Sequence, residues 1–404
     1  MTQRKRILFI AEAVTLAHVA RPYALARGLD PQAYEVVFAC ADNYGALFDT
    51  WPWQRESIWS ISPQVFMRRL AQGRRLYPLE TLKQYAREDL RLINTLQPDA
   101  IVGDFRLSLS ATARLAHVPY IALANAYWSP YAQRGRIPVP CLPMTRLLGV
   151  PLGAALFTLA APFAFAWHTL PLNRLRRDYG LPQLGLDLRR VYTDADITLY
   201  ADVPELVPTT GLPPRHRYIG PVEWSPSTEM PEFGLNDLGN RPLVYVTLGS
   251  SGSAELLPTI LEALSGIDCT VAAATAGVPL HHIPANAVVA DYLPGDRMAE
   301  RASLVICNGG SPTSHQALAR GVPVLGIPFN LDQHLNMHYV TAYGAGIALR
   351  PETITVSVLR AAAKTLLQDA TVRHRAEELA RIIRRHHPAE ALARTITEIT
   401  ETNS

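Results

Sequence analysis

The chain has 404 residues, of which 48% are hydrophobic and 18% charged, enough for two domains of ordinary size with sizeable cores. Its 38 basic and 35 acidic side chains leave a formal net charge of +3, which gives no electrostatic case for nucleic-acid binding. Four scattered cysteines without a C-x-x-C pair are expected to be buried, reduced thiols of a cytosolic protein.

Strands and helices alternate in the first half of the chain. The pattern predicts strands at residues 4–10, 34–39, 98–104 and 118–123, and an amphipathic helix at 18–29. The apolar part of the first strand is too short for a signal peptide. This alternation predicts a doubly wound parallel α/β sheet, in which ligands bind at the carboxyl ends of the strands.

A long run with few charges occupies residues 147–172, where only His168 can carry charge. Its length approaches the roughly 20 residues that cross a bilayer. Because three prolines interrupt the run, the favoured interpretation is one or two buried helices, which could form an apolar wall around a lipophilic acceptor. A face that contacts a membrane is the alternative.

The boundary between two domains is predicted at residues 223–240, which are rich in Pro, Ser, Glu, Asn and Gly without a clear period. This linker separates a first domain, residues 1–222, from a second, residues 241–385, where another series of strands and helices begins. A last helix within residues 386–404 is expected to pack back on the first domain.

Residues 304–313 form the most informative local pattern. An apolar run is followed by Gly309 and Gly310, and a helical pattern begins at Ser311 and Thr313. A strand, a Gly-rich turn and a helix N-terminus together form an anion site, because backbone N–H groups and the helix dipole both face the negative charge.

A second strand, predicted at residues 323–328, leads to a loop that carries Asp332 and Gln333, with Asn336 expected to support it. In a parallel sheet this loop lies at the same carboxyl edge as the glycine turn. A diphosphate cradle beside a carboxylate and an amide suits a nucleotide sugar.

These residues resemble the donor-binding signature of glycosyltransferase family 1, the UDP-glycosyltransferase and macrolide-glycosyltransferase group. The family pattern runs His-Gly-Gly-Ala/Ser-Gly-Thr, Glu, Gly-Val-Pro and Asp-Gln. In the same register this chain has Asn308-Gly309-Gly310-Ser311-Pro312-Thr313, Gln316, Gly321-Val322-Pro323 and Asp332-Gln333. The resemblance covers nearly the whole chain. It implies the GT-B fold, with two Rossmann-like domains facing each other across a cleft, the acceptor on the first and the donor on the second.

The resemblance further implies a donor site that needs no metal. The residues assigned to it are Gly249, Ser250, Ser251, Tyr292, Leu293, Asn308, Gly309, Gly310, Ser311, Thr313, Gln316, Asp332 and Gln333. Tyr292 falls at the position where the plant members of the family stack an aromatic ring on the nucleotide base. Three residues depart from the family pattern: Asn308 replaces His, Pro312 replaces Gly and Gln316 replaces Glu.

Sugar transfer also requires a base that removes a proton from the acceptor hydroxyl. His18 follows the first predicted strand, imidazole is a base near neutrality, and the position matches the base of the family. Asp104 ends a predicted strand and matches the family's aspartate. We therefore expect a His18–Asp104 dyad in which the carboxylate fixes the tautomer of the ring.

An apolar acceptor pocket is expected on the first domain. Its assigned residues are Trp51, Trp53, Tyr77 and Trp128, together with the run at 141–168. The D-x-D triplet at 194–196 precedes a strand and is expected to cap it, so no metal site and no cofactor are predicted.

The sequence thus predicts a cytoplasmic, inverting, metal-independent glycosyltransferase that moves a sugar from a UDP- or dTDP-sugar to a hydroxyl of a lipophilic small molecule. Two alternatives stay open. The run at 147–172 favours a membrane-associated lipid glycosyltransferase. The changes at Asn308, Pro312 and Gln316 favour a non-catalytic member that supports a partner enzyme. Peripheral membrane contact and a homodimer are compatible with both the small-molecule glycosyltransferase and the lipid glycosyltransferase.

Overall fold

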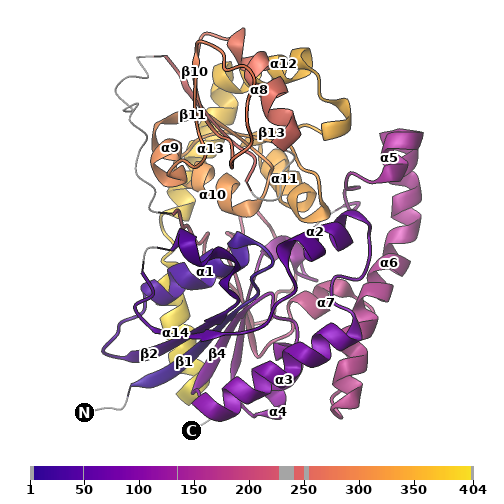
Figure 1. Ribbon diagram of the computed structural model, residues 1–404, viewed down its shortest axis with the longest axis vertical. Helices are drawn as coiled ribbons and strands as arrows, with labels where there is room; N and C mark the ends of the chain where they lie inside the picture. The colour runs from indigo at the N-terminus through magenta and orange to yellow at the C-terminus, as the bar shows by residue number, and fades with distance from the viewer. Residues whose placement is uncertain (1–3, 49, 134, 227–240, 250–253, 402–404) are drawn as a thin grey trace. The chain divides into compact units, whose positions relative to one another are not determined.

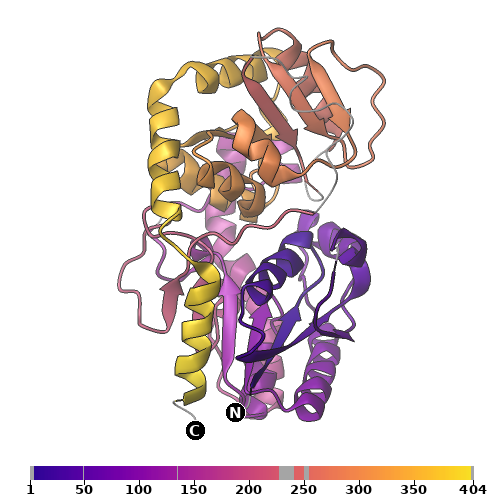
Figure 2. The ribbon, with the colours of Figure 1, turned by 90° about the vertical axis from the view of Figure 1, so that its left-hand side faces the viewer.

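The computed structural model divides into two compact α/β units (Figures 1 and 2). The residues that the structure describes are 4–48, 50–133, 135–226, 241–249 and 254–401. The first unit comprises Met1–Gly135, Thr158–Val222 and His386–Ser404. The second unit comprises Arg136–Phe157 and Glu223–Arg385. The prediction of two doubly wound α/β domains is confirmed.

The first unit is built on a parallel sheet of seven strands in the order β3-β2-β1-β4-β5-β6-β7. The strands are β1 (Lys5–Ala11), β2 (Tyr34–Cys40), β3 (Gln54–Ser57), β4 (Ala100–Asp104), β5 (Tyr120–Ala124), β6 (Ile197–Tyr200) and β7 (His216–Tyr218). The central strands β4 and β5 are buried along their whole length because helices cover both faces of the sheet.

Helices cover the first sheet on both sides. They are α1 (Leu16–Arg27), α2 (Pro63–Ala71), α3 (Leu79–Leu96), α4 (Leu109–Leu115), α7 (Leu188–Tyr192) and α14 (Pro388–Glu401), with 3₁₀ turns at Asp42–Leu47 and Ala126–Trp128. Leu8 and Ile10 of β1 face a core shared with α3 and α4. On the other side α1 contacts β1, β4 and α14, and Figure 2 shows α14 lying along this unit.

The second unit contains a parallel sheet of six strands in the order β10-β9-β8-β11-β12-β13. The strands are β8 (Leu243–Thr247), β9 (Thr270–Ala274), β10 (Ala287–Ala290), β11 (Ala302–Cys307), β12 (Val324–Gly326) and β13 (Gly346–Ala348). This order repeats the connections of the first six strands of the first sheet, although the two halves share no evident sequence repeat.

The second sheet is also covered on both faces. The helices of the second unit are α5 (Pro143–Leu148), α8 (Leu257–Ser265), α9 (Gly295–Arg301), α10 (Ser311–Ala319), α11 (Leu331–Tyr343), α12 (Val356–Gln368) and α13 (Ala370–Ile383), with 3₁₀ turns at Ala254–Leu256 and Pro351–Thr353. One core joins α8 and α12 to β8, β9 and β11. On the other side α9 and α10 contact strands of the sheet and each other.

Residues 136–157 group with the second unit, whereas the sequence placed them in the first domain. Polar contacts explain the difference. Arg350 donates from Nη1 to the carbonyl of Val139 at 2.7 Å, and Thr145 donates from Oγ1 to Glu352 at 2.8 Å. These bonds tie the segment before α6 to the loop after β13.

The run at 147–172 is not buried, so that prediction is wrong. It lies within α5 and the long helix α6 (Val150–Asp178), whose Pro162 and Pro171 are inside the helix. Among the described residues α6 is the one helix long and apolar enough to cross a membrane. Its most apolar 18-residue window has a mean hydropathy of 1.6, yet only 11% of that window is buried. The hydropathy of this run does not indicate burial, because apolar residues occur on all sides of α6 and only one side packs against protein.

Candidate active site

Each sheet has one point at which the strand order reverses. In the first unit it lies between β1 and β4, and in the second between β8 and β11. The crevice outside the carboxyl ends of such a strand pair is where open α/β sheets bind ligands. At the first point, His18 lies in the helix that follows β1, and Asp104 is the last residue of β4. Gly249 and Asn308 follow the strands at the second.

His18 and Asp104 are in direct contact. Nδ1 of His18, in the first turns of α1, lies 2.8 Å from Oδ1 of Asp104, the last residue of β4. Asp104 is fully buried, while the His18 side chain keeps 21% of its surface exposed. Burial alone would raise the pKa of Asp104, but the Arg21 charge and hydrogen bonds from His18 and Arg21 outweigh it and lower the pKa. An ionised Asp104 can only accept, so Nδ1 donates and Nε2 is left with a free lone pair.

Arg21 is a third member of this cluster that the sequence did not predict. Its Nε donates to Asp104 Oδ2 at 2.6 Å and its Nη2 to Oδ1 at 2.9 Å. Its Nη1 donates to Asn125 Oδ1 at 2.9 Å, and Asn125 in turn donates to Asp202 at 3.2 Å. The available signal was spacing: residues three apart on a helix share a face, which places Arg21 beside His18.

Phe105 fixes the plane of the His18 ring. The two rings stack with centroids 4.5 Å apart and an angle of 6° between their planes. Phe105 adopts φ +58°, a left-handed conformation that costs a bulky residue free energy and persists only where its surroundings hold it. The turn immediately after β4 therefore places a carboxylate and an aromatic ring against the same imidazole.

Two of the four predicted acceptor aromatics join the aromatic cluster around His18. Tyr77 lies 5.9 Å from Phe105, and Trp128 contacts Tyr192, which lies 5.3 Å from Phe105. A small cavity of about 20 Å³ has Tyr77 and Tyr192 in its wall. The hydroxyl oxygen of Tyr77 is buried without a hydrogen-bond partner in the structure.

The other two predicted acceptor residues belong to a different cluster. Trp51 lies 5.2 Å from Tyr23, and Trp53 stacks on Phe38 at 6.0 Å, over β2 and α1. Arg55 sits above the Trp51 ring at 4.6 Å. The structure does not bring Trp51 or Trp53 to His18, and both pack as part of the sheet's covering.

A buried ionic cluster supports the loop between β1 and α1. Arg106 is fully buried and bonds Glu12 at 3.1 Å and Asp89 at 3.0 Å. Tyr85 also donates to Glu12 at 2.7 Å. The two carboxylates raise the pKa of Arg106 although burial by itself opposes charge. Sequence reasoning missed this cluster, which holds the chain at Glu12, four residues before α1 begins at Leu16.

In the second unit the glycine turn after β11 is braced from α11. Asn336 donates from Nδ2 to the carbonyl of Gly309 and to Ser314 Oγ, both at 2.8 Å, and is almost fully buried. Gly310 donates to Asn308 Oδ1 at 3.0 Å. The sequence predicts that Asn336 supports the loop of Asp332 and Gln333, whereas its side chain bonds the glycine turn after β11 and the first turns of α10.

The first turn of α10 follows this brace. Gly310 is the N-cap of the nine-residue helix, and Ser311 and Thr313 lie in its first turn, with Pro312 where a missing N–H is tolerated. A Cβ placed on Gly249, after β8, would lie 3.2 Å from Asn308 Nδ2, so the two turns adjoin. Ser250 and Ser251, predicted to contact the donor, lie outside the described residues.

Gln316 and Gln333 both have structural partners. Gln316 donates to the Trp224 carbonyl at 2.7 Å and to Ser225 Oγ at 2.9 Å, which ties α10 to the start of the predicted linker. Gln333 and Asn330 form a capping box at the start of α11, with Gln333 accepting from the Asn330 N–H at 3.3 Å. A bound donor would therefore contact side-chain amides that already form hydrogen bonds within the protein.

The remaining predicted donor residues differ in accessibility. Tyr292 is 52% exposed and Leu293 is buried, just after β10. Asp332 is half-buried in the first turn of α11. The exposed ring of Tyr292 is available for stacking, while Leu293 belongs to the core.

The D-x-D triplet has structural partners on both carboxylates. Asp194 bonds Arg114 at 2.9 Å and Arg176 at 3.0 Å, and Asp196 accepts from the backbone N–H of Tyr120 at 2.8 Å. Across the described ranges no three His, Cys, Asp or Glu side chains gather as a metal site would require.

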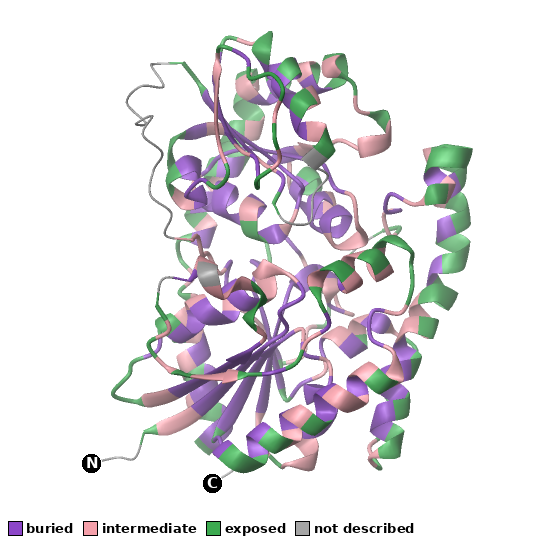
Figure 3. Cartoon of the chain, in the orientation of Figure 1, coloured by how far each residue is buried: buried purple, intermediate pink, exposed green. Residues whose placement is uncertain are grey.

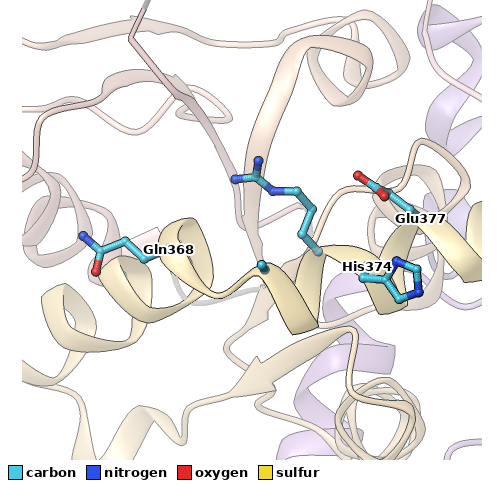
Figure 4. Close-up of a pocket in the computed structure, with 5 residues that line it drawn as sticks. Gln368, His374 and Glu377 are labelled. Carbon is cyan, nitrogen blue, oxygen red and sulfur yellow. The ribbon is translucent and has the colours of Figure 1, made fainter.

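A surface depression of about 390 Å³ lies on α12 and α13, apart from every predicted site residue. Its lining consists of Gln368, Ala370, Arg373, His374 and Glu377. Figure 4 shows that the labelled side chains are spread along the helices rather than converging on one point, so this depression does not compete with the strand ends.

Two parallel, doubly wound sheets with polar side chains at their reversal points are the architecture of the GT-B class of glycosyltransferases, although other two-domain proteins share it. Comparison with solved structures agrees: the spinosyn forosaminyltransferase SpnP superposes with a TM-score of 0.72 at 18% identity, covering 98% of this chain and 100% of that one. The family described as erythromycin biosynthesis protein CIII-like, C-terminal domain, matches residues 258–398.

Sequence relatives identify the family. A PGL/p-HBAD biosynthesis glycosyltransferase of Mycobacterium tuberculosis (strain ATCC 25177 / H37Ra) is 51% identical over 381 residues, 94% of this chain and 89% of the relative. A PGL/p-HBAD biosynthesis rhamnosyltransferase of Mycobacterium bovis (strain BCG / Pasteur 1173P2) is 51% identical over 379 residues, 94% and 84% of the two chains. The chain belongs to glycosyltransferase family 1, in its macrolide-glycosyltransferase-like group, and is a glycosyltransferase.

Proposed function

We propose that the enzyme moves a sugar from a nucleotide diphosphate sugar to a hydroxyl of a lipophilic acceptor, with inversion and without a metal. The observation that carries the proposal is the His18–Asp104 contact of 2.8 Å at the carboxyl edge of the first sheet. It leaves Nε2 of His18 as a proton acceptor on a partly exposed ring.

In the proposed reaction the acceptor oxygen attacks the anomeric carbon while His18 Nε2 removes its proton. The new bond joins that oxygen to the anomeric carbon, and the bond from the anomeric carbon to the diphosphate oxygen breaks. Asp104 stabilises the imidazolium that forms. Backbone N–H groups at the start of α10 stabilise the charge on the departing diphosphate. A single displacement inverts the anomeric centre.

The names of the relatives support a narrower assignment. Both are assigned to PGL/p-HBAD biosynthesis, and one is called a rhamnosyltransferase. We take the same biosynthetic role as the working assignment, with rhamnose as the first sugar to test and UDP and dTDP as the first nucleotides. The apolar surroundings of His18 support a lipophilic acceptor, and the cytoplasmic location is part of the same proposal.

The donor site is tested first by thermal unfolding with UDP, dTDP and GDP and no added metal. A nucleotide that binds only the folded enzyme raises Tm by mass action. A shift that appears only with added divalent metal would contradict the metal-independent part of the proposal. Binding of a nucleotide without sugar transfer to any acceptor would favour the non-catalytic alternative.

The base is tested with His18→Ala, and His374→Ala on the exposed side of α13 is the matched control. We expect His18→Ala to lower kcat by a factor of about 10²–10⁴ and to leave the nucleotide-induced rise in Tm unchanged. His374→Ala should retain the wild-type rate. Near-normal transfer by His18→Ala would rule out the proposed base.

A further inference from the structure

A continuous stripe of large apolar side chains on α6 faces water. The exposed members recur every three or four residues, the spacing of one helix face: Leu152, Leu156, Leu159, Phe163, Trp167 and Leu170. Leu159 is 71% and Phe163 79% exposed. Figure 3 shows the green, exposed colour over much of α6.

The opposite face of α6 packs into protein. Leu172 and Leu175 are fully buried in a core of the first unit, and Phe157 and Ala161 are buried earlier on the same side of the helix. A helix that is apolar all round is stable only where both sides leave water. Because one side is already packed, α6 can lie along a second apolar phase but cannot be surrounded by it.

Basic side chains extend the stripe. Arg174 and Arg177 continue its spacing at the C-terminal end of α6, and residues 147–173 contain no acidic side chain. Arg75 lies over the Trp167 ring at 4.2 Å and donates from Nε to its carbonyl at 3.2 Å.

The segment around Arg75 is basic as well. Residues 57–79 carry Arg68, Arg69, Arg74 and Arg75 and no acidic residue. An acid is present beyond the stripe: Asp178 bonds Arg174 at 2.9 Å. Arg75, in contact with Trp167, and Arg177, at the C-terminal end of α6, place positive charge beside the apolar stripe, which complements an anionic surface.

We propose that α6 docks the enzyme on the surface of a membrane that contains anionic lipid. Leu, Phe and Trp on one face with arginines beside them characterise a helix that lies in a bilayer interface, where the guanidinium groups reach the headgroups. Anionic headgroups add attraction for each nearby arginine. Docking would bring the first unit to a phase in which a lipophilic acceptor dissolves.

A second copy of the chain fits the stripe less well. In a twofold pairing the stripe would contact the same stripe, and its basic residues would find no acidic partner within 147–173. A bilayer satisfies both the apolar length and the basic end. A membrane therefore accounts for both the apolar stripe and its basic end, whereas pairing of two copies accounts only for the apolar stripe.

Vesicle binding of the full chain tests the proposal. Co-sedimentation is measured with phosphatidylcholine vesicles and with vesicles that also contain phosphatidylglycerol. We expect stronger binding to the anionic vesicles, reduced by salt. The double variant Leu159→Gln/Phe163→Gln should weaken binding by at least about tenfold, because two large apolar side chains are lost from the contact.

Matched controls isolate the face. Val358→Gln, on α12, changes an apolar side chain that is 40% exposed outside the stripe and should bind vesicles as wild type does. Arg174→Gln/Arg177→Gln should reduce the preference for anionic vesicles, while Arg394→Gln on α14 should not. Unchanged Tm of each variant shows that the fold is intact.

Three results would overturn the proposal: no binding of the wild-type chain, equal loss in the stripe and control variants, or equal binding to neutral and anionic vesicles. If the stripe variant instead halves the mass measured by light scattering, the face is an interface between copies. No donor or acceptor is present in these measurements, so failure of the proposed sugar transfer would not alter them.

Discussion

At the scale of single residues, Asp104 accepts hydrogen bonds from two side chains rather than one. It accepts from His18 at 2.8 Å and from Arg21 at 2.6 and 2.9 Å, with no surface exposed to water. Arg21 therefore holds the carboxylate where it contacts the imidazole, and its charge helps to keep Asp104 ionised although the group is buried.

This sharing predicts that Arg21→Gln lowers activity. Asp104 loses two hydrogen bonds and holds the His18 ring less firmly, so kcat should fall by at least about tenfold while the nucleotide-induced rise in Tm stays unchanged. Arg27→Gln, on the same helix and exposed, is the control and should keep the wild-type rate. A wild-type kcat for Arg21→Gln would mean that Arg21 only supports the fold.

At the scale of elements, the turn between β11 and α10 depends on a glycine. Gly309 has φ +74°, and a Cβ there would lie 2.6 Å from Cγ of Met337 on α11. The turn must therefore pass close to α11, where Asn336 braces it. The contacts with Asn336 and Met337 thus fix the position of the turn and of the α10 N-terminus relative to the end of β11.

Gly309→Ala tests that dependence. The strained φ costs about 1–2 kcal/mol and the overlap with Met337 about 1–3 kcal/mol more, so both Tm and donor affinity should fall. Gly185→Ala is matched for backbone strain, at φ +81°, but a Cβ there meets nothing within 4 Å. It should lose stability from strain alone and bind nucleotide normally. Equal effects of the two substitutions on nucleotide binding would contradict the role of the turn.

At the scale of the whole molecule, each unit buries a histidine. His216 bonds Tyr200 at 2.8 Å in the first unit, and His334 lies on α11 in the second. Burial, with Arg215 nearby, lowers the pKa of His216 to about 4. Burial and Arg350, opposed by Glu352, lower the pKa of His334 to about 4.

These shifts predict that acid destabilises the fold. Between pH of about 6.5 and 4 the unfolded chain binds protons at both histidines and the folded chain does not, so the free energy of unfolding falls as pH falls. The loss is at most about 3 kcal/mol for each histidine. Calorimetric Tm values across this range should decline less for His216→Gln than for wild type, with His374→Gln as the control. A parallel decline in His216→Gln would rule out this contribution.

The sequence by itself determined the local architecture and the signature residues. Alternating strands and helices require both faces of a parallel sheet to be covered, so the doubly wound class follows from pattern. The glycine turn could be recognised because it stands directly after a strand, and His18 because it lies at the start of the helix that follows the first strand. Asp104 could be paired with His18 because parallel strands end at one edge.

Only the tertiary structure decided which side chains share those ends. Arg21 joins His18 at Asp104, and Gln316 is bonded to Trp224, through contacts between residues distant in sequence. The exposure of α6 was likewise undetermined, because hydropathy records how apolar a helix is and not which neighbours cover it. Partners and burial are properties of the packed fold, since they depend on elements that meet only after the chain has folded.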